Sequence, residues 1–248
     1  MRMTQVHIRI YIVHCCHALT LISPARWIVS CNFNEFWRES EKKMQSQLVK
    51  RIVHVSTNAR TAQALVPIKV KRVTIEPSYL ILLAESQFRK TSALESVIEN
   101  PKEALKVKMK TAVDPFRPFE DDLCVERFVA PHHTLLLNKF CVIQQHILLI
   151  TTEFESQINH LNCSDWYASL DVMKRLADER IGFYNRGLHS GASQPHKHIQ
   201  FVPVVDPEDQ SHIFPITSLL TSLVEQNPHI KQVPFFSFKH GFISIQHI

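Results

Sequence analysis

The chain has 248 residues, of which 45% are apolar, 21% charged and 9% aromatic, and its formal net charge is +5. With only four glycines and an ordinary charged fraction, it is neither collagen-like nor globally disordered. The small basic excess suits an anionic ligand, but no dense Lys/Arg stripe interleaved with aromatic residues indicates nucleic-acid binding. The longest apolar runs fall well short of the roughly 20 residues of a membrane span. We therefore expect a globular protein with neither a nucleic acid nor a membrane as partner.

Two features of the sequence concern the compartment in which the protein works. None of the six cysteines forms a C-x-x-C pair, which predicts reduced thiols and argues against a disulfide framework or a thiolate zinc site. No Asp or Glu precedes Glu35 although arginines are present, and such a composition resembles an organelle-targeting segment. We expect residues 1–40 to be an extension without a fold of its own, in a cytoplasmic protein, with a mitochondrial location as the alternative.

The first predicted element is a helix over residues 34–51, where apolar residues recur at helical spacing among charged ones. Two strands are predicted over residues 66–73 and 79–84, near prolines. Residues 93–110 are a mixed helical and basic stretch, whose lysines are typical of a solvated face. This half of the chain therefore predicts both helices and strands.

Strands dominate the second half of the chain. The predicted order is strands at 134–137 and 147–151, a helix at 166–179, a short strand at 181–185 and, after a loop, a strand at 196–205. This order predicts an α+β domain with an antiparallel sheet.

The loop before the last of these strands concentrates the glycines of a glycine-poor chain. Gly182, Gly187 and Gly191 lie within ten residues, which indicates close approach of the backbone to another group or positive φ angles. Small hydroxyl and amide side chains between residues 184 and 195 allow the loop to offer donors to phosphate oxygens, as a nest does. The spacing fits neither a P-loop nor a dinucleotide fold, and an ordinary turn is the alternative.

The strand that follows begins with H-K-H-I-Q. Because side chains two residues apart share a strand face, His196, His198 and Gln200 are predicted to project together. An imidazole held at one nitrogen by an acceptor can attack phosphorus with the other. Zinc is disfavoured because no third ligand lies at ligand spacing, and plain packed histidines are a further alternative. The donors for the growing phosphoryl charge are Ser190, Ser193, Gln194 and Gln200.

Over residues 190–200 the sequence S-G-A-S-Q-P-H-K-H-I-Q resembles the histidine-triad superfamily. Within it, the motif H-x-H-x-Q is similar to that of the ATP adenylyltransferases, also called diadenosine tetraphosphate phosphorylases. The resemblance is specific over residues 183–200, weak over 65–110 and absent before 41. Further similar segments are D-P-F at 114–116, T-L-L-L-N-K-F at 134–140, F-E-S-Q at 154–157 and residues 233–240.

The resemblance implies a histidine-triad-like antiparallel sheet with flanking helices, apparently without the family's C-terminal segment. It divides the chain into a non-family extension at 1–40, an N-terminal part at 41–112 and a catalytic core at 113–248. It assigns the nucleophile to His198, and the sequence itself shows no set of metal ligands. The implied substrate-binding residues are Asn138, Lys139, Asn185, Ser190, Gly191, Ala192, Ser193, Gln194, His196 and Gln200.

The implied activity is that of a nucleotidyltransferase acting reversibly on diadenosine tetraphosphate and phosphate. His198 attacks the α-phosphorus, ATP leaves, and phosphate converts the AMP–histidine intermediate to ADP. We expect a divalent cation, chiefly Mg²⁺, to arrive with the nucleotide, and no tightly bound cofactor. We also expect a monomer or weak oligomer with small-molecule partners. The alternatives are a non-catalytic adenine-nucleotide-binding protein and a dinucleoside polyphosphate hydrolase.

Overall fold

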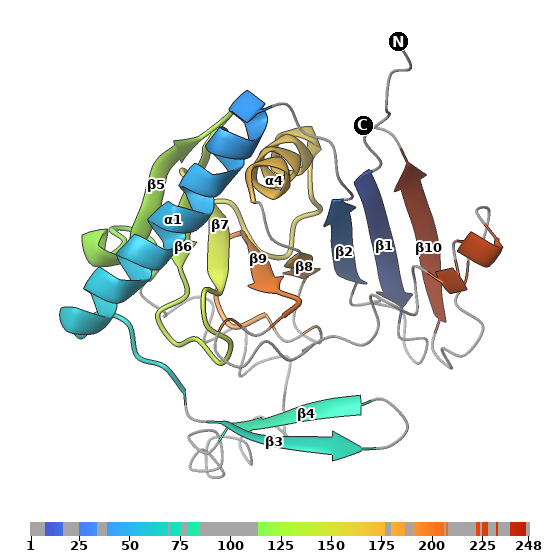
Figure 1. The fold of residues 1–248 in the computed structure, drawn as a ribbon, viewed down its shortest axis with the longest axis horizontal. Helices are drawn as coiled ribbons and strands as arrows, with labels where there is room; N and C mark the ends of the chain where they lie inside the picture. The colour runs from blue at the N-terminus through green and yellow to red at the C-terminus, as the bar shows by residue number, and fades with distance from the viewer. Residues whose placement is uncertain are drawn as a thin grey trace.

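The structure is a computed structural model that describes residues 8–16, 25–33, 39–68, 70–75, 79–84, 114–176, 180–186, 190, 192–205, 207, 222–223, 225–227, 232 and 239–246. Within these residues eight strands form one sheet, with antiparallel pairing throughout, and two more form a separate antiparallel hairpin (Figure 1). In sheet order the eight strands are β10 (Lys239–Gln246), β1 (Ile8–Cys16), β2 (Ala25–Phe33), β8 (Arg180–Asn185), β9 (His198–Pro203), β7 (Ile147–Thr151), β6 (His133–Leu137) and β5 (Cys124–Val129). The hairpin pairs β3 (Val70–Ile75) with β4 (Tyr79–Ala84).

Two long helices of the described chain, α1 (Glu39–Thr61) and α4 (Cys163–Arg175), pack against strands β5 to β9 (Figure 1). α4 begins at a capping box, because Asn162 and Asp165 each accept a hydrogen bond from the other's backbone N–H. Lys174 and Arg175 lie in its last turn, where positive charge complements the helix dipole. The capping box fixes the position of Asp165, which also belongs to the site described below.

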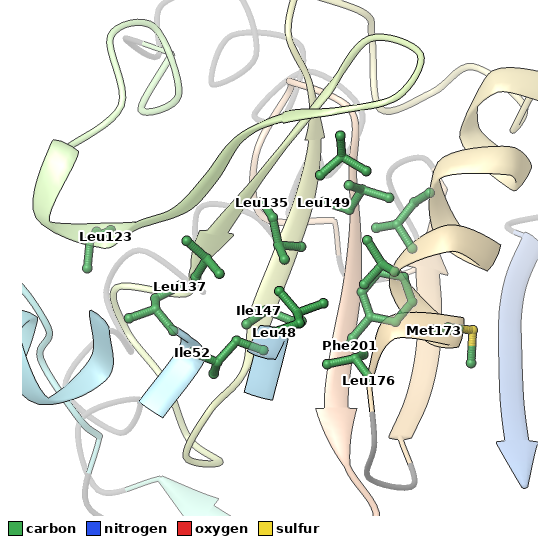
Figure 2. Close-up of a cluster of buried hydrophobic side chains, with 14 of the residues drawn as sticks. Leu48, Ile52, Leu123, Leu135, Leu137, Ile147, Leu149, Met173, Leu176 and Phe201 are labelled. Atoms are coloured by element: carbon green, nitrogen blue, oxygen red, sulfur yellow. The ribbon is translucent and has the colours of Figure 1, made fainter. Parts of the chain in front are cut away.

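The main core lies between these helices and the sheet (Figure 2). Leu48 and Ile52 of α1, Met173 of α4, Leu149 of β7 and Phe201 of β9 are each at most 3% exposed. Complete burial of such a side chain contributes about 1.5–3 kcal/mol relative to leaving it exposed. The core thereby anchors β7 and β9, the two strands that carry the candidate site.

The opposite face of β6 and β7 is buried as well. Leu136, Leu148 and Ile150 form a second cluster, and Phe116 and Phe119 pack against it. Both strands are therefore covered on both faces, which explains why their sequences are apolar without alternation. This packing brings residues 114–119 onto the face of the sheet where the motif histidines lie.

The structure confirms the α+β class and most of the predicted strands. The strands predicted at 79–84 and 147–151 have the observed bounds, and those predicted at 134–137, 181–185 and 196–205 lie within two residues of β6, β8 and β9.

Other predicted bounds differ. The strand predicted at 66–73 is observed as β3, and the helix predicted at 166–179 as α4. The helix predicted at 34–51 begins at Glu39 and continues to Thr61, since Ile52, Ser56 and Ala59 extend its buried face. β5 was not predicted, and the stretch 93–110 lies outside the described residues.

The expectation that residues 1–40 have no fold of their own is wrong. β1 and β2 lie in this region, and β2 pairs with β8, which joins both strands to the main sheet. The physical reason is visible in the sequence, because Ile8, Ile10 and Ile12 alternate with other residues at the period of a strand. The proposed boundaries at 40 and 112 stay predictions.

None of the helices in the described part of the chain is both long enough and apolar enough to cross a membrane.

Candidate active site

His198 is the first residue of β9, which lies between β8 and β7 within the sheet. The residue is 3% exposed, and its Nδ1 lies 2.8 Å from the carbonyl oxygen of His196. Because a carbonyl oxygen only accepts hydrogen bonds, Nδ1 carries the proton and the lone pair is at Nε2. Burial lowers the pKa of the ring, with the hydrogen bond to His196 opposing this shift. The site thus holds a neutral imidazole whose Nε2 is unprotonated.

His196 differs from His198 because both of its ring nitrogens are engaged. Nδ1 lies 2.8 Å from Asp114 Oδ2, while Nε2 lies 2.8 Å from the Thr151 carbonyl oxygen and 3.0 Å from Thr151 Oγ1. The residue is fully buried. Its ring ties the motif to the end of β7 and to the segment at Asp114, and leaves no nitrogen free to react.

Two phenylalanines form an apolar wall beside the histidines. The Phe116 ring centroid lies 5.6 Å from that of His196 and 5.7 Å from that of His198. The Phe154 ring lies 5.4 Å from that of His196. Since one ring contacts both imidazoles, they lie on the same side of the motif, as the alternation predicts. Phe116 also contributes to the burial that lowers the pKa of His198.

A third histidine, His146, enters the site immediately before β7. Burial lowers its pKa to about 4, the Gln200 side chain opposes this shift, and His198 and Arg180 reinforce it. Its Nδ1 lies 3.1 Å from Asn138 Nδ2, so Nδ1 accepts and Nε2 carries the proton. Gln200 is near enough to affect the ring, yet Nε2 has no partner with full hydrogen-bond geometry among the described residues. The sequence reasoning missed this residue.

The opposite face of the motif carries a buried charged network. Lys197 is 1% exposed, and its Nζ lies 2.6 Å from Glu155 Oε2 and 2.9 Å from Asp165 Oδ2. His133 Nε2 lies 3.0 Å from the other carboxylate oxygen of Asp165. Burial opposes both charges, but these hydrogen bonds outweigh it, so the pKa of Lys197 is raised and that of Asp165 is lowered. Lys197 and Asp165 therefore stay ionised at neutral pH.

The other predicted binding residues lie around this centre. Asn138 follows β6 and contacts His146, and the Lys139 ammonium lies 2.6 Å from Glu120 Oε1. Asn185 ends β8, where its carbonyl oxygen accepts a hydrogen bond from the Gln157 side chain at 2.8 Å.

The predicted phosphate-binding loop is described only in part. Ser190 is buried, Ala192 and Gln194 are half-buried, and Ser193 is exposed. Gly191 lies outside the described residues. The role of this loop as a phosphate site stays a prediction.

A family model described as the Ap4A phosphorylase N-terminal domain matches residues 38–222, well over half of the chain. The chain belongs to this family. The predicted resemblance to the diadenosine tetraphosphate phosphorylases, and with it a histidine-triad-like fold, is thereby confirmed. The match begins close to the first residue of α1 and includes the whole H-K-H-I-Q motif.

Similar proteins include members of the Ap4A phosphorylase family from yeast. Diadenosine 5',5'''-P1,P4-tetraphosphate phosphorylase 2 of Saccharomyces cerevisiae is 37% identical over 102 residues, which are 37% of this chain and 31% of that protein. The solved structure of yeast Ap4A phosphorylase Apa2 in complex with AMP is 26% identical, with a TM-score of 0.52, and the match covers 77% of this chain and 57% of that one.

A second structure of Apa2, in complex with Ap4A, matches with a TM-score of 0.56 at 24% identity and covers 77% of this chain and 60% of that one. The matches to this chain thus cover about a third of the curated yeast phosphorylase and under two thirds of Apa2.

Proposed function

We propose that this member of the Ap4A phosphorylase family is a nucleotidyltransferase that splits diadenosine tetraphosphate with inorganic phosphate through an AMP–His198 intermediate. The observation that carries the proposal is the 2.8 Å contact between His198 Nδ1 and the His196 carbonyl oxygen, which assigns the lone pair to Nε2. Family membership supports the substrate class, as do the Apa2 complexes with AMP and Ap4A.

The reaction has two balanced displacements. In the first, the Nε2 lone pair of His198 forms a bond to the α-phosphorus, the bond from that phosphorus to the bridging oxygen breaks, and ATP leaves. In the second, an oxygen of inorganic phosphate attacks the same phosphorus, the P–N bond breaks, and ADP leaves with His198 restored. Covalent capture splits one difficult displacement into two easier ones. The proton stays on His198 Nδ1, and its hydrogen bond to the His196 carbonyl oxygen stabilises the positive charge that the ring acquires.

The neighbouring polar groups fit supporting roles. In this proposal the Gln200 amide donates a hydrogen bond to a phosphoryl oxygen. Because a carboxamide does not titrate, Gln200 neither gives nor takes a proton during the reaction. His146, whose pKa is about 4, is neutral at pH 7 and adds no charge beside His198. The hydroxyl and amide groups of Ser190, Ser193 and Gln194 are the further phosphate donors in this proposal.

We also propose that a divalent cation reaches the site bound to the polyphosphate. No group of three His, Cys, Asp or Glu side chains in the described part of the chain is placed to hold a metal ion. Asp114 pairs with His196, and Asp165 and Glu155 pair with Lys197. Mg²⁺ commonly binds through substrate phosphates with few protein ligands. Full turnover in excess chelator would refute this part of the proposal.

The decisive assay follows products with and without inorganic phosphate. Phosphorolysis predicts continued turnover to ATP and ADP in equal amounts only when phosphate is present, and without phosphate no more than one ATP per protein molecule. AMP released at the same rate without phosphate would show a hydrolase, and calorimetric binding without turnover would show a nucleotide-binding protein. His198→Ala, assayed beside the wild-type chain, is the matched control for contaminating activity.

A further inference from the structure

The ladder between β8 and β9 ends just before His198. Its last pair is Phe183 with Gln200, and the same antiparallel register, continued, would set Asn185 opposite His198. On the other edge of β9, His198 pairs with Ile150 of β7. The backbone groups of Asn185 and His198 that point into the gap between β8 and β9 therefore need other partners.

The side chain of Gln157 supplies these partners. Its Oε1 accepts from the His198 backbone N–H at 2.7 Å. Its Nε2 lies 2.8 Å from the Asn185 carbonyl oxygen and 3.3 Å from the His198 carbonyl oxygen. Gln157 is fully buried. One carboxamide thus satisfies one N–H and two C=O groups at the point where the two strands part.

Only one orientation of this carboxamide fits its three contacts. The reverse orientation would set the amide nitrogen against the His198 N–H and the amide oxygen against two carbonyl oxygens. The Gln157 backbone is itself held, because its N–H donates to the Pro195 carbonyl oxygen at 2.8 Å and its carbonyl oxygen accepts from the Tyr184 hydroxyl at 2.9 Å. The side chain is therefore preorganised before any ligand binds.

We propose that Gln157 is a positioning residue for His198, which holds the backbone of the nucleophile at the fork between β8 and β9. Its effect on turnover rests on the proposed function, whereas its effect on the backbone does not. Without the carboxamide, the strands either close toward the usual ladder spacing of about 4.8 Å or lose their hydrogen bonds. Either change moves the His198 ring, and a misplacement of about 1 Å costs on the order of 100-fold in rate.

The test uses two substitutions of Gln157 and one matched control. Gln157→Met keeps the side-chain volume and removes all three hydrogen bonds. Gln157→Glu keeps the shape but replaces the donor with a second oxygen. Tyr184→Phe is the control: it removes the hydrogen bonds to the carbonyl oxygens of Gln157 and Asn159, both at 2.9 Å, but keeps the Gln157 carboxamide, its three strand contacts and the backbone contact to Pro195.

We expect Gln157→Met to lower kcat about 10- to 100-fold while KM for diadenosine tetraphosphate changes less than about threefold, since Gln157 is fully buried and its carboxamide is engaged by the backbone. Tyr184→Phe should lower the melting temperature about as much as Gln157→Met does. It should nevertheless keep kcat within about threefold of wild type. An equal loss of kcat in the two variants would overturn the proposal.

The pH dependence of kcat in Gln157→Glu distinguishes two roles of Gln157, namely holding the His198 backbone by hydrogen bonds and merely filling space in the core. An ionised carboxylate at this position faces two carbonyl oxygens, whereas a protonated one donates to one of them and still accepts from His198 N–H. The kcat of Gln157→Glu relative to wild type should therefore rise at least about tenfold between pH 9 and pH 5. A ratio that stays flat across this range would overturn the proposal.

Hydrogen exchange of the His198 backbone amide tests the role of Gln157 in the free protein, without substrate or turnover. We expect this amide to exchange about tenfold faster in Gln157→Met than in Tyr184→Phe, because only the first loses its acceptor. Equal exchange in both variants would overturn the proposal. A wild-type chain that does not turn over diadenosine tetraphosphate would refute the proposed function, and the exchange comparison would still decide the role of Gln157.

Discussion

Lys197 and His198 are adjacent in the sequence and both are almost fully buried, yet their chemical situations are opposite. The Lys197 ammonium points toward α4 and lies within 2.9 Å of two carboxylates. The His198 ring lies on the other face of the motif, where a single carbonyl oxygen holds Nδ1. On one face of the strand, the Lys197 ammonium is thus paired with two carboxylates. On the other face, His198 keeps a lone pair available at Nε2.

This difference gives a criterion for the role of buried polar groups. A group whose polar atoms all have partners serves structure, because any new contact would first have to break an existing one. A buried group that is held at one atom and open at another, as His198 is, keeps that second atom available to a ligand. By this criterion His196, with both nitrogens engaged, belongs with Lys197 although it shares a face with His198.

The largest expected effect is that of His198→Ala on turnover. Removing the atom that forms the proposed covalent intermediate should lower phosphorolysis by at least about 10³-fold, because both ring nitrogens of the neighbouring His196 already have partners. In urea unfolding, His198→Ala should lose less unfolding free energy than Lys197→Met does. Residual turnover above about a tenth of wild type would break the distinction between the two faces.

Lys197→Met should act mainly on stability. The substitution keeps most of the side-chain stem and leaves Asp165 buried without its cation, which costs about 3–5 kcal/mol of unfolding free energy. The double variant Lys197→Met/Asp165→Asn is the control and should lose less than the single variant, because no unpaired buried charge is left. A loss below about 1 kcal/mol for Lys197→Met would show that this network is not a structural anchor.

On the face of the motif that carries His198, His146 makes the stability of the fold depend on pH. Its pKa is about 4 in the folded chain and 6.5 ordinarily, so the unfolded state binds the proton first as pH falls below 6.5. This contribution is fully present above pH 6.5 and is lost toward pH 4, by about 2–3 kcal/mol at pH 4.5. Urea unfolding of His146→Gln between pH 7 and 4.5 should show a smaller decline than wild type by that amount. Parallel declines would refute the assignment.

The smallest effect on stability is expected for Lys139→Ala. The Lys139–Glu120 pair is more than a third exposed on average, so its loss should change the unfolding free energy by less than about 1 kcal/mol. If the ammonium binds substrate phosphate, KM for diadenosine tetraphosphate rises several-fold while kcat is kept. Glu120→Gln, which removes the pair and keeps the ammonium, is the control and should not raise KM. An unchanged KM in Lys139→Ala would remove this residue from the binding site.

Local patterns predicted the strands and the arrangement of the motif. The apolar run of β7 gave its bounds, and the alternation of H-K-H-I-Q placed His196 and His198 on one side, where Phe116 contacts both. The same alternation in β1 was outweighed by the acid-poor composition of residues 1–40, and the strands there were missed.

Contacts between distant parts of the chain were beyond such patterns. Lys197 meets Asp165 and Glu155 across 32 and 42 residues, and no local spacing predicts that pairing. The place of His146 could have been predicted from the sequence, because the β6–β7 hairpin register brings it beside Asn138.

The most direct test of the central claim is the location of the covalent AMP. The protein is mixed with diadenosine tetraphosphate without phosphate, quenched at alkaline pH and digested, and the modified residue is found by mass spectrometry. We predict the adduct on His198 in wild type, the same adduct at reduced yield in His196→Ala, and none in His198→Ala. An adduct on His196, or one that persists in His198→Ala, would contradict the account.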